Sequence, residues 1–102
     1  MTDKIAAKVV ARVIKGFDLN KVKKIQQMTD RNDHQNAYVE GAKLLGAKHL
    51  EKKFKLVADL YKLEGHMPSG LRDYSYSLYK DLMTFAQQQL PPSDYELFSS
   101  AF

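Results

Sequence analysis

The 102-residue chain contains no cysteine, which excludes disulfide bonds, thiolate catalysis and any zinc or iron–sulfur site held by cysteine. No apolar run approaches the roughly 20 residues that a membrane-spanning helix needs. A signal-peptide pattern is absent as well. The sequence also has no Gly-x-Ser-x-Gly elbow, no glycine-rich phosphate loop and no pair of histidines at the i, i+4 spacing of a helical metal site. We therefore expect a cytoplasmic protein that is not an enzyme and needs no cofactor or metal ion.

The balance of residue types is that of a folded protein. Hydrophobic residues make up 44% and charged residues 27%, which argues against wholesale disorder. The length is that of one domain. We expect a single helical domain over residues 1–102, divided into a basic N-terminal pair of helices (1–30), core helices (33–90) and a C-terminal latch (91–102).

Positive charge is confined to the first part of the chain. Residues 1–62 hold 14 Lys and Arg against 7 Asp and Glu, whereas residues 63–102 hold 2 against 5. The net charge of +4 therefore combines +7 in the first segment with −3 in the second. Such a distribution favours an anionic partner only where the basic residues lie together on the surface.

The apolar residues recur with the period of an α-helix, and we find no convincing β-strand. Gly46 either ends or kinks the third helix. We favour a break there, because one helix over residues 33–63 would be unusually long. The sequence predicts an all-α bundle of five to six helices, over residues 3–15, 19–29, 33–45, 47–63, 70–90 and 93–98.

Local signals mark the ends of the last two helices. Ser69 is the expected N-cap of the fifth helix, and Pro91 and Pro92 stop it. Ser93, with Glu96 three residues later, forms an expected capping box for the last helix. The C-terminal latch either folds back on its own bundle or docks into another subunit.

Several helices carry more apolar surface than one small bundle needs. In the helix over residues 47–63, Leu56, Leu60 and Leu63 widen the apolar face, and Lys53 lies inside this arc. We expect Lys53 to reach a carboxylate or the edge of an interface, because burying an unpaired ammonium is costly. Three such helices are hard to make central together in a small domain. We therefore expect a homodimer through the fourth and fifth helices or the latch; in the alternative, other helices of the same chain cover these faces.

Aromatic and methionine side chains gather near the start of the fifth helix and at the C-terminus. Such side chains are enriched in protein interfaces, although they are also common in cores. The leading hypothesis is a small non-catalytic interaction module, an adaptor or regulator that binds a protein partner. The expected protein-binding residues are Tyr74, Tyr76, Tyr79, Met83, Phe98 and Phe102.

The alternative hypothesis is nucleic-acid binding through lysines of the second and fourth helices. If these lysines converge, they would neutralise phosphates, and affinity would fall steeply with salt; a solvated helix face is the simpler interpretation. Arginine, which most often reads guanine edges, occurs three times in the chain, so phosphate contacts would dominate. The candidate nucleic-acid-binding residues are Lys21, Lys23, Lys24, Lys48, Lys52 and Lys55.

Overall fold

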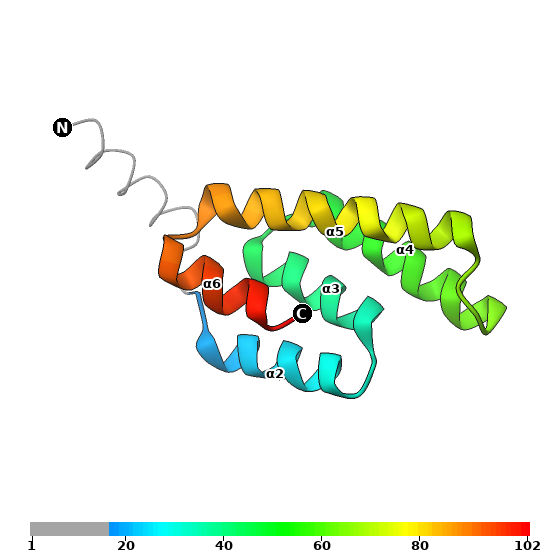
Figure 1. Ribbon diagram of the computed structural model, residues 1–102, viewed down its shortest axis with the longest axis horizontal. Helices are drawn as coiled ribbons and strands as arrows, with labels where there is room; N and C mark the ends of the chain where they lie inside the picture. The colour runs from blue at the N-terminus through cyan, green and yellow to red at the C-terminus, as the bar shows by residue number, and fades with distance from the viewer. Residues whose placement is uncertain (1–16) are drawn as a thin grey trace.

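Five α-helices and no β-strand make up residues 17–102, the part of the chain that the computed structural model describes (Figure 1). The predicted all-α class is confirmed for these residues, whereas the helix expected over residues 3–15 lies outside them. No helix in this range combines the length and apolar character that crossing a bilayer requires. The helices are α2 (Leu19–Asp30), α3 (His34–Leu45), α4 (Lys48–Glu64), α5 (Ser69–Gln89) and α6 (Pro92–Ser100).

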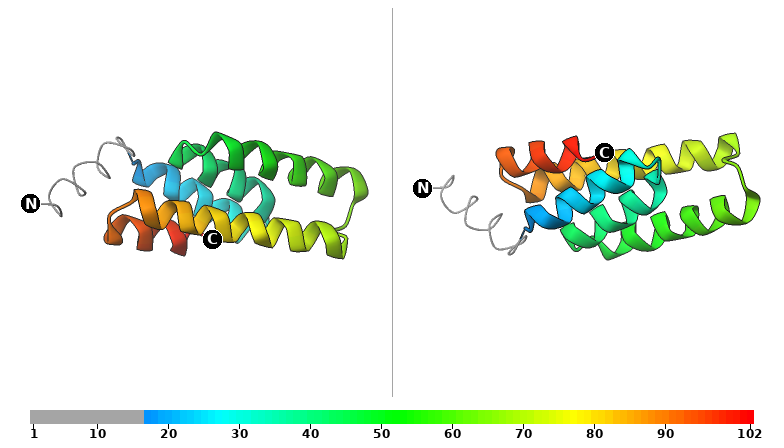
Figure 2. Two further views of the ribbon diagram at one scale, coloured as in Figure 1. Left: turned by 90° about the horizontal axis from the view of Figure 1, so that it is seen from above. Right: turned by 90° about the horizontal axis from the view of Figure 1, so that it is seen from below.

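Helix α3 occupies the middle of the bundle. It packs against α2, α4 and α5, while α6 packs against α5 and α2. Figure 2 shows α5 and α6 along one side of the molecule and α4 along the other. With 17 and 21 residues, α4 and α5 are longer than the 12-residue α3. The closed end of the α4–α5 hairpin therefore extends past α3 (Figure 1).

The break between α3 and α4 is confirmed at Gly46. This residue has a φ of 71°, in the left-handed region that glycine adopts without a steric penalty. The N–H of Ala47 then donates to the carbonyl of Ala42 at 2.9 Å. This six-residue closure is the Schellman arrangement that commonly ends helices. It turns the chain so that α4 packs back along α3.

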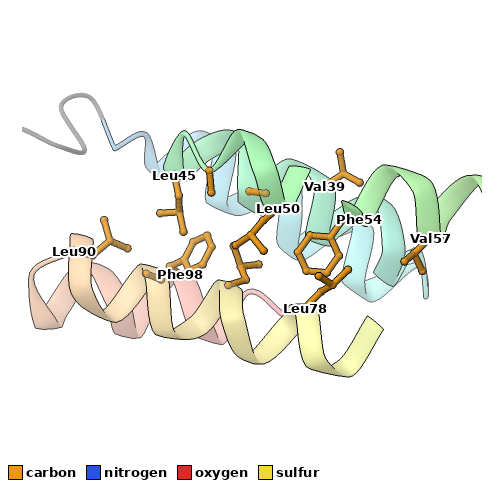
Figure 3. Close-up of a cluster of buried hydrophobic side chains, with 12 residues drawn as sticks. Val39, Leu45, Leu50, Phe54, Val57, Leu78, Leu90 and Phe98 are labelled. Atoms are coloured by element: carbon orange, nitrogen blue, oxygen red, sulfur yellow. The ribbon is translucent and has the colours of Figure 1, made fainter. Parts of the chain in front are cut away.

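The core lies where α4 and α5 meet α3 and α6. Phe54 and Val57 of α4, Leu82 of α5 and Phe98 of α6 are among the largest fully buried side chains. Figure 3 shows Leu50 and Phe54 pointing from α4 toward α5. A smaller apolar cluster joins α2 to α3 and the C-terminus. Burial of these apolar surfaces is the main stabilising contribution to the fold.

The C-terminal latch packs on its own chain. Phe98 and Ala101 are fully buried, and the Thr29 hydroxyl of α2 donates to the carbonyl of Ala101 at 2.7 Å. Phe102 lies so close to Gly41 of α3 that a Cβ there would come within 2.6 Å of the Phe102 ring. The absence of a side chain at Gly41 thus allows the close approach of α3 and the C-terminus.

The start of each of the last two helices differs from the prediction. Pro68 occupies the N-cap position of α5, and Ser69 is its first helical residue. Pro91 occupies the N-cap position of α6, so Ser93 lies in the first turn and the predicted capping box is not formed. Neither helix has a side-chain cap hydrogen bond. Pro92 has a φ suited to the first helical position and no N–H that needs a cap.

The buried face of α4 is narrower than the sequence predicts. Leu56, Leu60 and Leu63 are exposed, and so is Lys53. Lys53 forms no ion pair with a carboxylate of residues 17–102, so the expected acidic partner is not among the described residues. The physical reason is that these exposed side chains lie on a different side of α4 from the buried row of Leu50, Phe54 and Val57, which packs in the core.

Candidate functional site

A groove of about 460 Å³ lies between α3 and α5, near the loop that joins α4 to α5. We call it the tyrosine groove, because tyrosine rings make up much of its wall. This volume falls within the range that binding sites for small ligands and side chains occupy. The groove is lined by His34, Gln35 and Tyr38 of α3, by Met67 of the loop, and by Arg72, Ser75, Tyr76 and Tyr79 of α5.

Helical spacing places the α5 residues of the groove on one face. Arg72, Tyr76 and Tyr79 follow one another at intervals of four and three residues, and Met83 continues the same face four residues later. The neighbouring face of α5 is buried in the core. The core packing of α5 therefore fixes the direction in which this row of side chains points.

Tyr38 connects the groove to the core. Its ring centroid lies 5.6 Å from that of Tyr79 and 5.3 Å from that of the buried Phe54. Tyr76 stacks beside Tyr79, with ring centroids 6.4 Å apart and an interplanar angle of 18°. Aromatic rings at these separations attract one another. The wall of the groove is therefore a packed set of rings and offers pre-ordered apolar surface to a ligand.

A partly buried hydrogen bond joins the two walls of the groove. The Ser75 hydroxyl of α5 donates to Oε1 of Gln35 on α3 at 3.1 Å. Ser75 is the buried polar residue of the described core. Because its hydroxyl has a partner, burial of this group carries no unsatisfied polar penalty. The bond holds α3 and α5 in register at the groove.

The groove has a positive rim. Arg72 is exposed and makes no ion pair with any carboxylate in residues 17–102, where the pair between Lys43 and Glu40 at 3.6 Å is the one found. The ammonium of Lys80 lies 5.0 Å from the centre of the Tyr76 ring. None of the described residues that line the groove is an Asp or a Glu. A ligand with a carboxylate near Arg72 is thus favoured over a cation.

Burial raises the pKa of the Tyr38 phenol above its ordinary value, and the nearby Tyr79 phenol raises this pKa further. Protonated Tyr38 therefore favours the folded state. This contribution is complete below the pKa of an unfolded tyrosine, about 10, and is lost as the pH rises through the higher pKa of the folded state.

We expect the free energy of unfolding to fall less steeply above about pH 10 in Tyr38→Phe than in the wild type. Urea denaturation of both proteins at several alkaline pH values measures the difference between their free energies of unfolding. Other titrating groups are common to both proteins, so their contributions cancel in this difference. Tyr76→Phe serves as the control, because Tyr76 is exposed on the same groove. Equal slopes for wild type and Tyr38→Phe would contradict the assignment.

The structure divides the predicted protein-binding residues among three places. Tyr76 and Tyr79 lie together in the groove, and the half-buried Met83 continues their face of α5. Tyr74 lies on the opposite flank of α5. The remaining two, Phe98 and Phe102, belong to the latch: Phe98 is fully buried and Phe102 packs on Gly41 and Tyr38.

Sequence reasoning missed the α3 side of the groove and the role of Arg72. The intervals of four and three residues between Arg72, Tyr76 and Tyr79 indicate that these side chains share one face of a helix. Nothing in the sequence indicated that Gln35 and Tyr38, some forty residues earlier, would lie opposite. That juxtaposition results from the packing of α3 against α5.

The candidate nucleic-acid-binding lysines are exposed but belong to two helices. Lys21 and Lys24 of α2 line a small pocket of about 190 Å³ together with Lys43 of α3. Glu40, the ion-pair partner of Lys43, lines the same pocket and reduces its positive charge. The lysines of α4 do not line this pocket. The six candidates are Lys21, Lys23 and Lys24 on α2 and Lys48, Lys52 and Lys55 on α4.

No protein-family model, curated protein or solved structure matches this chain. The chemistry of the groove indicates what the protein can bind. Ring faces provide apolar contact area, the guanidinium of Arg72 provides charge-assisted hydrogen bonds, and Gln35 and His34 provide further polar groups at the wall. This set suits recognition of a ligand that has both an apolar and an anionic part.

Proposed function

We propose that the protein is a small non-catalytic interaction module, an adaptor or regulator in the cytoplasm, that binds a segment of a partner protein in the tyrosine groove. The observation that carries this proposal is the row of Arg72, Tyr76 and Tyr79 on α5 facing Tyr38 of α3 across one groove. Tyrosine and arginine are the residue types that most often dominate the energy of protein interfaces.

The positive rim defines the chemistry of the partner segment. An apolar or aromatic side chain of the partner would lie against the rings of Tyr38 and Tyr76, and a neighbouring carboxylate would pair with Arg72. A lysine-rich segment would meet Arg72 and Lys80 with like charge. The proposed partner is therefore an acidic segment with an apolar anchor.

Selection from a random peptide library tests this proposal. The library is displayed on phage and selected on the immobilised protein, with Arg72→Glu as the counter-selecting variant. We expect enriched peptides to combine Phe, Leu, Met or Tyr with an Asp or Glu within a few residues, and to bind the wild type more tightly than Arg72→Glu. Absence of enrichment, or peptides that bind both proteins equally, would overturn the proposal. Lys62→Glu, an exposed charge reversal on α4, is the matched control and should bind like the wild type.

Nucleic-acid binding is a second candidate, supported by the exposure of all six candidate lysines. Fluorescence anisotropy with a short DNA duplex and a single-stranded RNA, each at about 50 and 200 mM salt, separates the two functions. Phosphate contacts would give affinity that falls by orders of magnitude at the higher salt. They would also be lost in the double variant Lys48→Glu and Lys52→Glu. No binding at low salt would eliminate this candidate.

We also propose that the module is a homodimer. Support comes from the exposed leucines of α4, because contiguous exposed apolar surface on a small domain commonly marks an interface. The sequence suggested two dimer surfaces, the latch and the pair of α4 and α5. Because the latch packs on its own bundle, we propose that α4 and α5 form the dimer contact.

A further inference from the structure

The exposed leucines of α4 form one straight seam. Leu56, Leu60 and Leu63 are 54%, 37% and 80% exposed. Together with His49 and Lys53 they follow one another at alternating intervals of four and three residues. This is the spacing of the a and d positions with which a helix packs along a second helix. We call these five residues the leucine seam.

The leucine seam lies beside α5. The ring of His49 is 6.2 Å from that of Phe85, in an edge-on arrangement, so this side of α4 meets α5 along the outer flank of the hairpin. Tyr74, 41% exposed, precedes Phe85 by three helical turns and lies on the same face of α5. The apolar surface therefore continues from the leucine seam onto Tyr74, on the flank of α5 opposite the tyrosine groove.

We propose that a second copy of this chain covers the leucine seam, with the two α4 helices antiparallel about a two-fold axis near residue 58. In this register, Leu56 of one copy lies opposite Leu60 of the other. Lys53 lies opposite Leu63 and beside Glu64 of the other copy, so the ammonium at one end of the seam meets the carboxylate at its other end. A parallel arrangement would instead place Lys53 against Lys53, which like-charge repulsion disfavours.

This dimer has a consequence for the tyrosine groove. The outer flank of α5, with Tyr74, and the groove face, with Tyr76, point in different directions from the same helix. Both grooves therefore stay open in the dimer, and each dimer offers two binding sites. The inference rests on the proposed homodimer and is independent of what the groove binds.

Sedimentation equilibrium of the full chain measures the dimer dissociation constant. We expect Leu60→Glu to raise this constant by about 100-fold or more, because each dimer would lose two buried leucines and bury two carboxylates. Leu97→Glu is the matched control: Leu97 is as exposed as the seam leucines but lies on α6, and its variant should dimerise like the wild type. A monomeric wild type, or a dimer that persists in Leu60→Glu, overturns the proposal.

Cysteine cross-linking measures the direction of the two helices. Because the natural chain has no cysteine, single variants give unambiguous disulfides. Mixed Lys53→Cys and Leu63→Cys proteins are expected to form the Lys53–Leu63 disulfide under mild oxidation, and Lys53→Cys alone to remain uncross-linked. Residues 53 and 63 are about 15 Å apart along the helix, so the two arrangements are easily distinguished. A prominent disulfide between two copies of Lys53→Cys overturns the antiparallel arrangement. Either result leaves the test of peptide binding to the groove unaffected.

Discussion

Replacing Phe98 with Ala is expected to lower the free energy of unfolding by about 3–5 kcal/mol. Phe98 has 0% of its surface exposed, and its ring packs edge-on against Phe102 at 5.1 Å between centroids. Removing the ring would leave a cavity where α6 meets α3, with Gly41 unable to fill it. Most natural domains have only about 5–15 kcal/mol of stability, so a large part of the total would be lost.

Leu97→Ala is the matched control for this prediction. Leu97 precedes Phe98 in the chain but is 48% exposed, so its truncation should change the free energy of unfolding by about 0.5 kcal/mol or less. Urea denaturation followed by circular dichroism measures both variants. Equal stabilities for Phe98→Ala and Leu97→Ala would mean that the latch does not pack on its own bundle.

Replacing Tyr76 with Ala is expected to weaken binding of a groove-selected peptide by about 2 kcal/mol, which corresponds to a roughly 30-fold higher dissociation constant. Tyr76 is 56% exposed in the groove wall, where its ring lies beside that of Tyr79 and 5.0 Å from the Lys80 ammonium, so a ligand can cover the exposed part of the ring. Because Tyr76 is outside the core, the variant should keep the wild-type free energy of unfolding to within about 0.5 kcal/mol.

Tyr74→Ala provides the comparison for Tyr76→Ala. The two tyrosines are exposed on the same helix and separated by a single residue, but Tyr74 lies on the outer flank, away from the groove. Fluorescence anisotropy with a labelled peptide should show wild-type affinity for Tyr74→Ala. Equal losses in both variants would indicate a general effect on α5, and a loss confined to Tyr74→Ala would place the peptide on the outer flank of α5, beside the leucine seam.

Sequence periodicity predicted the helices well because their ends carry strong local signals. Gly46 at the end of α3 and the proline pair after α5 act through their own backbone preferences, which depend little on tertiary packing. The N-caps were less predictable. At Ser69 and Ser93 a serine competes with an adjacent proline for the same turn, and the choice between them depends on how the chain enters the helix.

The side of α4 that remains exposed was not predictable from its own sequence. Leu50 and Leu60 have the same side chain, yet Leu50 is buried and Leu60 is exposed, because they lie on different sides of α4 and the core packs on the side of Leu50. The groove was predictable in part. Helical spacing joined Tyr76 to Tyr79, whereas the contact of Tyr79 with Tyr38 depends on long-range packing that local patterns do not encode.

An amide chemical-shift map of the isotope-labelled protein, titrated with a groove-selected acidic peptide, locates the binding site directly. We expect the largest shifts at residues of both walls of the tyrosine groove, around Tyr38 and Gln35 on α3 and around Tyr76 and Tyr79 on α5. Residues of α2 and the outer face of α4 should change little. Shifts concentrated on the lysines of α2 and α4, with an unperturbed groove, would contradict the assignment of the site.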